Sequence, residues 1–192
     1  MPINIPILLT WLRIIMIPLM ICVYYLPTPW LFSLSRDLAA MLIFVTAAVT
    51  DWLDGFLARH WNETSSFGAF LDPVADKLVV AAALIMLVQL DRVDAIIAVI
   101  IIGREIAISA LREWMAAIGA NKHGAVSVIG KVKTVAQMVA ISMLLYHNEI
   151  TGINIQKIGT WLIYVAAALT LWSMGYYIYK AWPEIVKHDC RR

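Results

Sequence analysis

The feature that most limits the fold of this 192-residue chain is a series of six apolar runs. They cover roughly residues 5–26, 38–59, 74–90, 93–113, 125–147 and 158–181. Each is close to the ~20 residues that an α-helix needs to cross the hydrocarbon core of a bilayer. Only helices or closed barrels satisfy their backbone hydrogen bonds in lipid, and these runs do not alternate as barrel strands do. The pattern predicts an all-α, polytopic membrane protein: a six-transmembrane-helix bundle in a single domain over residues 1–192.

Composition and charge agree with a membrane protein. Hydrophobic residues make up 62% of the chain and charged residues only 15%, whereas a soluble domain has about 25% charged residues. The formal net charge of +2 gives no footprint for nucleic-acid binding. The two cysteines, Cys22 and Cys190, lie in an apolar run and in the tail, so no disulfide framework is expected.

The basic residues predict the orientation of the bundle. If the N-terminus is cytoplasmic, the outer turns near residues 27–37, 90–94 and 148–157 hold only Arg36, Arg92 and Lys157 of the fifteen lysines and arginines. The other basic residues fall at cytoplasmic helix ends and loops. Because Lys and Arg are enriched on the cytoplasmic side, both termini are expected in the cytoplasm.

Four carboxylates, Asp51, Asp54, Asp72 and Asp76, lie on or beside the second and third runs. A charge at membrane depth costs at least a few kcal/mol and by default marks function. Spacings of three and four residues put each pair on one helix face, and a short cytoplasmic loop brings the two pairs together. Four neighbouring carboxylates repel one another, and hard divalent cations with oxygen ligands remove that conflict. Two metal ions sharing a carboxylate could clamp a phosphoryl group during displacement.

These acids belong to a longer pattern with fixed gaps. It reads D-x2-D-G-x2-A-R-x8-G-x3-D-x3-D and adds Gly55, Ala58, Arg59 and Gly68 to the four acids. At every fixed position the pattern resembles the signature of the CDP-alcohol phosphotransferase family, whose six helices also suit the whole chain. The chain most resembles the bacterial members that use glycerol 3-phosphate. The residues that carry this closer resemblance are Asn4-Ile-Pro6, Thr10, Arg13, Thr50 to Arg59, Leu71 to Lys77, Arg104-Glu105, Leu111-Arg112, Gly130 to Thr134 and Gln137.

The resemblance implies roles for these residues. Asp51, Asp54 and Asp72 would hold one Mg²⁺ or Mn²⁺ ion, and Asp72 and Asp76 a second, shared with the substrate diphosphate. Asp76 would also be the general base. Gly55, Ala58 and Gly68 would line a cytidine pocket, Arg59 would contact the diphosphate, and Asn4, Thr10 and Arg13 would border the nucleotide site. The implied substrates are CDP-diacylglycerol and glycerol 3-phosphate, in a homodimer surrounded by lipids of the bacterial cytoplasmic membrane.

Four cations in the second half of the chain suggest a site for an acceptor that carries its own phosphate. Arg104 and Arg112 lie about two helical turns apart with faces ~80° apart, so their long side chains can converge. Lys131 and Lys133 are two residues apart and point to nearly opposite sides of a helix. At most one of them easily faces the site, and the resemblance favours Lys131. Without an acceptor site, these cations would reach anionic headgroups or pair with Glu105 or Glu113.

Two alternatives stay open at this point. The same chemistry could use another acceptor, such as inositol phosphate, whose phosphate also requires cations. A small ion or proton transporter also carries intramembrane acids and bases, but the chain has no inverted repeat or pair of broken helices. Release of CMP from CDP-diacylglycerol would distinguish an enzyme from a transporter.

Overall fold

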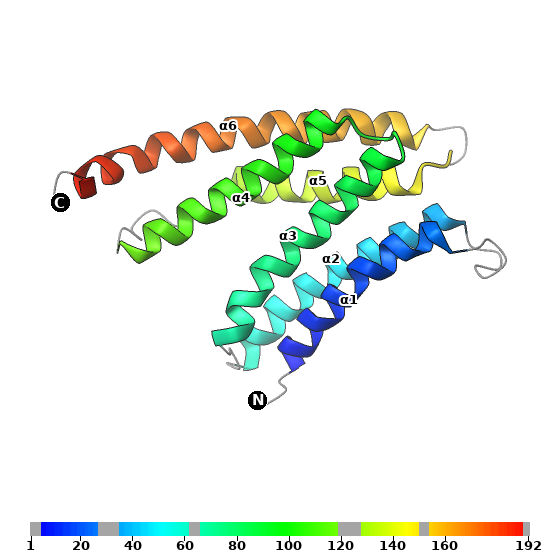
Figure 1. The fold of residues 1–192 in the computed structure, drawn as a ribbon, viewed down its shortest axis with the longest axis horizontal. Coiled ribbons are helices and arrows are strands. Elements are labelled where there is room, and N and C mark those ends of the chain that lie inside the picture. The colour runs from blue at the N-terminus through cyan, green and yellow to red at the C-terminus, as the bar shows by residue number, and fades with distance from the viewer. Residues whose placement is uncertain (1–4, 27–34, 62–65, 119–127, 150–153, 190–192) are drawn as a thin grey trace.

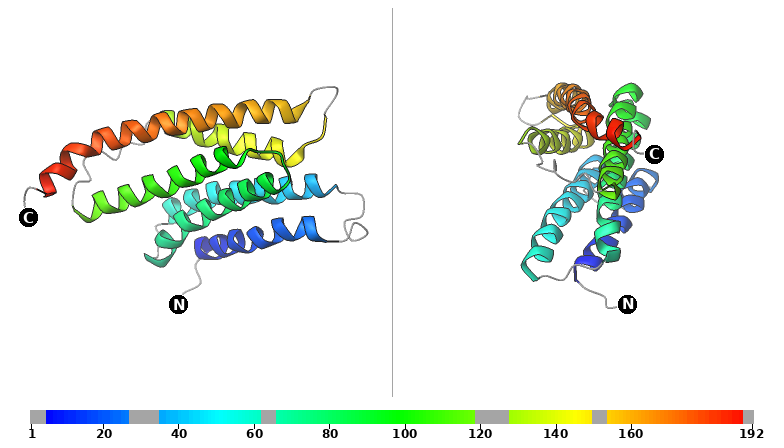
Figure 2. Two further views of the ribbon diagram at one scale, coloured as in Figure 1. Left: turned by 45° about the horizontal axis from the view of Figure 1, so that its top comes forward. Right: turned by 90° about the vertical axis from the view of Figure 1, so that its left-hand side faces the viewer.

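All six expected helices are present in the computed structural model, which describes residues 5–26, 35–61, 66–118, 128–149 and 154–189. No strand occurs among these residues. The helices are α1 (Ile5–Tyr25), α2 (Arg36–Trp61), α3 (Ser66–Gln89), α4 (Ala95–Ala117), α5 (Val128–Tyr146) and α6 (Ile155–Asp189). They run back and forth between the two ends of the bundle, with α1, α2 and α3 inclined to α6 (Figures 1 and 2). The all-α prediction is therefore confirmed.

The alternation gives the bundle two ends. The starts of α1, α3 and α5 lie with the ends of α2, α4 and α6 at what we call the terminal end, on the left in Figure 1. The turns after α1, α3 and α5 lie at the opposite end. Asp91, two residues after α3, and His147, directly after α5, have φ values of 54° and 55° and lie in the turns that reverse the chain there. Such left-handed residues commonly end helices.

Two helices extend beyond the apolar runs that predicted them. Helix α3 begins at Ser66 instead of near residue 74, so the second acid pair lies inside a regular helix. Helix α6 continues to Asp189 instead of ending near residue 181. Hydropathy marks the part of a helix that suits lipid, whereas backbone hydrogen bonds continue into the polar residues on either side.

The helices pack as two connected groups. Helix α1 packs against α2 and α3, α6 packs against α4 and α5, and contacts of α2 with α5 and of α3 with α4 join the groups. Helices α5 and α6 approach closely at Gly159, where a Cβ atom would lie 3.0 Å from Cγ of Leu144. Small residues at such crossings let membrane helices approach closely.

Many large apolar side chains lie on the outside of the bundle. Large apolar side chains point outward on every helix, among them Leu8, Val49, Ile85, Val99 and Trp161, while several polar side chains are buried. Exposed apolar surface on this scale is typical of contact with lipid or with another protein. By length and composition, two helices of the described chain could each cross a membrane, over Leu8–Tyr25 and Ile155–Tyr179. Charged residues within α2, α3 and α4 lower the hydropathy of those helices.

Candidate active site

Helix α1 supplies two fully buried polar side chains to the acids of α2 and α3. Thr10 donates its hydroxyl hydrogen to Oδ1 of Asp72. Arg13 places Nη1 2.8 Å from Oδ1 of Asp51, whose side chain remains 41% exposed. Buried charges are stable only when they are paired and hydrogen-bonded, so the acids explain why an arginine is tolerated inside α1. We call Asp51, Asp72 and Asp76, with Thr10 and Arg13, the carboxylate cluster.

Asp76 joins this cluster to the second half of the molecule. It is close enough to Asp51 and Arg13 to interact with both electrostatically, and also to Glu105 on α4 and Lys77 on its own helix. Lys77 in turn donates from Nζ to the hydroxyl of Ser109 on α4. Asp76 therefore lies where α3 faces α4, and it is partly accessible.

The cluster fits a divalent cation by the chemistry of its donors. Its ligands are carboxylate oxygens, the type that Mg²⁺ and other hard cations take. Within the described residues, no group of three or more His, Cys, Asp and Glu side chains is placed to hold a metal ion. The side chain of Asp54, the fourth expected ligand, lies outside the described part, so the complete set of four stays a prediction.

The residues expected at the nucleotide site are described unevenly. Gly68 is buried near the start of α3, and Thr10 is buried against Asp72. Asn4 lies outside the described residues. Gly55, Ala58 and Arg59 belong to the last turns of α2, but their side chains lie outside the described part. Their predicted roles stay predictions.

A second polar group lies between α4, α5 and α6, and we call it the polar cluster. Its members are Arg104, Glu105, Arg112, Lys133, Gln137, Thr170, Ser173 and Tyr177. Arg104 donates from Nη2 to the hydroxyl of Ser173 over 3.0 Å. The guanidinium of Arg112 lies 5.7 Å from the ring centre of Tyr177, a cation–π contact. Arg104, Glu105 and Arg112 all lie within electrostatic range of Lys133.

The orientation expected for Lys133 is wrong. The side chain is 1% exposed and faces Arg104, Glu105 and Arg112, not the opposite side of the helix. Helix α5 is apolar on almost every side, so no amphipathic stripe fixes its rotation. Lys131 lies on the same helix, but its side chain is outside the described part, and its predicted role stays a prediction.

Sequence reasoning missed the contribution of α6. Ser173 accepts a hydrogen bond from Arg104 and donates one to the backbone oxygen of Thr170 over 2.9 Å. Thr170, Ser173 and Tyr177 recur at spacings of three and four residues within an apolar run, so they share one face of the helix. That spacing was the available signal.

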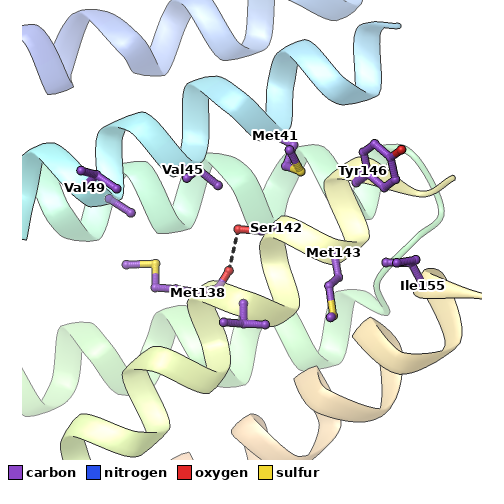
Figure 3. A pocket seen from close by; sticks show the side chains of 10 residues that line it. Met41, Val45, Val49, Met138, Ser142, Met143, Tyr146 and Ile155 are labelled. Atoms are coloured by element: carbon purple, nitrogen blue, oxygen red, sulfur yellow. Dashed lines mark hydrogen bonds between the residues drawn. The ribbon is translucent and has the colours of Figure 1, made fainter. Parts of the chain in front are cut away.

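A hollow of about 660 Å³ lies away from both clusters, between α2, α5 and the start of α6 (Figure 3). Its lining is apolar apart from Ser142 and Tyr146, and the Ser142 hydroxyl is already used by the backbone oxygen of Met138 over 2.9 Å. No acid of the carboxylate cluster lines it. A diphosphate has no described charged partner there, so this hollow is not the place for the chemistry.

The sequence is similar to a family model and to several bacterial proteins over most of its length. The family model for CDP-alcohol phosphatidyltransferase matches residues 3–172. The CDP-diacylglycerol–glycerol-3-phosphate 3-phosphatidyltransferase of Escherichia coli strain K12 is 50% identical over 188 residues, which cover 97% of this chain and 99% of that protein. The protein of the same name from Sodalis glossinidius is 50% identical over 192 residues, covering 98% and 100%. A third, from Shigella flexneri serotype 5b, is 50% identical over 188 residues.

Proposed function

The chain belongs to the CDP-alcohol phosphatidyltransferase family, and on that premise we propose that it transfers the phosphatidyl group of CDP-diacylglycerol to sn-glycerol 3-phosphate. The products are phosphatidylglycerol phosphate and CMP. Near-complete coverage at 50% identity to relatives that carry this activity in their names supports the assignment.

The observation that carries the proposal is the meeting of acids and cations at Asp76. Asp76 lies within electrostatic range of Asp51 on α2 and of Glu105 on α4. Glu105 in turn acts on Lys133 together with Arg104 and Arg112. One substrate brings a diphosphate and the other brings a phosphate and hydroxyls. A site with carboxylates for metal-bound diphosphate on one side and cations on the other suits that pair of substrates.

In the proposed reaction, Asp76 accepts the proton of the attacking hydroxyl of glycerol 3-phosphate. The alkoxide oxygen forms a bond to the phosphorus that bears diacylglycerol. The bond from that phosphorus to the oxygen it shares with the CMP phosphate breaks, and CMP leaves with the electron pair. A carboxylate can act as this base when one of its oxygens is free to accept the proton.

We propose that Asp51, Asp54, Asp72 and Asp76 hold two divalent cations, Mg²⁺ or Mn²⁺. Bound there, such ions neutralise charge on the transferring phosphoryl group and on the leaving group. Asn4, Thr10, Gly55, Ala58, Arg59 and Gly68 are the residues proposed for the nucleotide and its diphosphate. Thr10 orients Asp72 through its hydrogen bond, which keeps one ligand in place before substrate arrives.

The acceptor phosphate is assigned to Arg104, Arg112 and one lysine of α5. Lys133 takes that place in the proposal because it is buried within electrostatic range of both arginines, whereas the resemblance favours Lys131. Arg presents two parallel donors to a phosphate, whereas Lys acts as a point charge. An acceptor without a phosphate, such as serine, would leave these cations without an anion to bind.

We further propose that residues 1–192 form one domain with six membrane spans in the bacterial cytoplasmic membrane. The exposed apolar side chains on all six helices support this arrangement. The placement of lysines and arginines supports a cytoplasmic terminal end and hence cytoplasmic termini. A homodimer is part of the proposal by resemblance to the family.

An acceptor screen with the purified chain tests the proposed function. CMP release from CDP-diacylglycerol is followed with glycerol 3-phosphate, inositol phosphate or serine, before and after metal removal. We expect rapid release only with glycerol 3-phosphate, loss of activity in EDTA, and recovery with Mg²⁺ or Mn²⁺. Preference for inositol phosphate would change the acceptor, full activity without metal would rule out the metal site, and no CMP release at all would favour a transporter.

A further inference from the structure

Three buried atoms of the polar cluster have no hydrogen-bond partner among the described residues. They are Oε1 of Gln137, Nε of Arg104 and Oγ1 of Thr170. Gln137 is 1% exposed. An unsatisfied buried polar group destabilises the folded state, so native proteins rarely keep several together without a ligand or water to complete them. The cluster therefore has hydrogen-bonding capacity left for a small polar molecule.

Gln137 is held in one orientation by its neighbour on α4. Its Nε2 donates to Oε1 of Glu105 over 3.2 Å. A carboxylate only accepts hydrogen bonds, so the reversed amide would set two acceptors against each other. Oε1 of Gln137 must then be the free end. Gln137 also lies one helical turn after Lys133 on the same face of α5, beside the cations rather than toward lipid.

The chemistry of a free amide oxygen selects its partner. It accepts hydrogen bonds but cannot donate one, and the oxygens of an ionised phosphate also only accept. The partner of Oε1 therefore has to be a donor such as a hydroxyl group. Lys133 and the two arginines are donors that suit a phosphate, so the two halves of a hydroxylated phosphate ester match the two parts of the cluster.

We propose that Gln137 determines acceptor specificity: its Oε1, fixed by Glu105, accepts a hydrogen bond from the hydroxyl of glycerol 3-phosphate that does not attack. The inference rests on the proposed function and deepens it. Asp76 takes the proton of the attacking hydroxyl, the cations hold the phosphate, and Gln137 recognises the remaining hydroxyl on the middle carbon. Glu105 is a positioning residue that acts through Gln137.

The test compares glycerol 3-phosphate with 3-hydroxypropyl phosphate, which lacks only the middle hydroxyl. We measure kcat/KM for both acceptors with the purified full chain and CDP-diacylglycerol. The wild-type enzyme should prefer glycerol 3-phosphate by about tenfold or more, because a site that hydrogen-bonds a hydroxyl rejects the analogue without it. In Gln137→Met, which keeps the length of the side chain and loses the amide, the preference should fall to about twofold or less.

Two further variants make the result decisive. Gln89→Met is the matched control, because Gln89 is exposed at the opposite end, where it donates to the hydroxyl of Tyr25; it should keep the full preference. If Gln137→Met does not fold, Gln137→Asn keeps an amide but withdraws its oxygen, and the preference should fall there too. A preference that survives in a folded Gln137 variant would overturn the inference and leave the proposed function intact. A wild-type enzyme inactive with glycerol 3-phosphate would overturn both.

Discussion

Arg92 and Arg104 both lie between helices, yet their surroundings differ. At the opposite end, Arg92 donates from Nη2 to both oxygens of Asp37, over 2.9 and 3.0 Å, and from Nη1 to the backbone oxygens of Leu144 and Leu145. Arg104, in the polar cluster, donates over 3.0 Å to Ser173, and its Nε has no partner among the described residues. Both arginines occupy partly buried positions.

The difference indicates that Arg92 holds helices together, whereas Arg104 is available to bind a ligand. Arg92 joins the start of α2 to the last turn of α5, where backbone oxygens lack partners within the helix. Both of its terminal nitrogens donate to partners within the protein. Arg104 has donors to spare next to two more cations, which is a costly arrangement unless an anion completes it. Matched substitutions in the two regions test this distinction.

The largest effect is expected from a pair of aspartates. Asp76→Asn keeps the shape of the side chain but cannot accept the proton, so kcat should fall by about 10²-fold or more. Binding of CDP-diacylglycerol should change less. Asp94→Asn is the control, because Asp94 caps α4 at the opposite end through Ile96 N and Asn caps helices equally well. Steady-state rates and the affinity for CDP-diacylglycerol are measured for both variants. Near-normal turnover in Asp76→Asn would show that Asp76 is not the general base.

The two arginines themselves should separate stability from affinity. Arg92→Met leaves Asp37 and two backbone oxygens without their donor, so unfolding free energy should fall by about 2–3 kcal/mol. Its KM values should stay unchanged. Arg104→Met should raise the KM for glycerol 3-phosphate and change stability little. Thermal unfolding in one detergent and initial rates measure the two properties, and a reversal of the two patterns would end the distinction.

A pair of lysines gives the next largest effect. Lys133→Met removes the buried charge beside Arg104 and Arg112, and should raise the KM for glycerol 3-phosphate by about tenfold or more, since one hydrogen bond to a charged group contributes ~1.5–3 kcal/mol. The KM for CDP-diacylglycerol should hardly move. Lys157→Met, exposed at the opposite end, should leave both KM values as they were. Equal changes for both substrates in Lys133→Met would assign this lysine to the fold or to the diphosphate.

The smallest effect is expected from a pair of tyrosines. Tyr177→Leu removes the ring beneath the Arg112 guanidinium, and a cation–π contact at an exposed position contributes about 0.5–1 kcal/mol. The KM for glycerol 3-phosphate should therefore rise by about two- to fivefold. Tyr164→Leu, an exposed change on the same helix, should have no effect on it. Initial rates measured at several concentrations of glycerol 3-phosphate give the KM of each variant. An unchanged KM in Tyr177→Leu would mean that Arg112 is oriented without the ring.

Much of the fold could be predicted because the lipid environment restricts the backbone to a few forms. Six apolar runs gave six helices in the expected order. The polar extensions of α3 and α6 escaped prediction, because a hydropathy pattern marks a membrane boundary rather than the end of backbone hydrogen bonding. The acids at Asp51, Asp72 and Asp76 could be predicted because fixed gaps on helices determine their faces.

The polar cluster was harder to predict, since it depends on how helices rotate against one another. Spacing shows that Lys131 and Lys133 point apart, but on an almost uniformly apolar helix it does not show which of them faces inward. The roles of Gln137 and Ser173 require knowledge of their partners on other helices. These partners are determined by the packing of α5 against α4 and α6, and the sequence of α5 alone does not predict them.

The division of labour among the helices also has a consequence for how such enzymes can diverge. The carboxylate cluster comes from α1, α2 and α3, whereas the polar cluster comes from α4, α5 and α6. A lineage could therefore exchange one alcohol for another by substitutions confined to the later half of its gene. The part that encodes the proposed catalytic acids would stay under separate selection. Among descendants of one ancestor, we expect the first three helices to change slowly and the inward faces of the last three to record each change of acceptor.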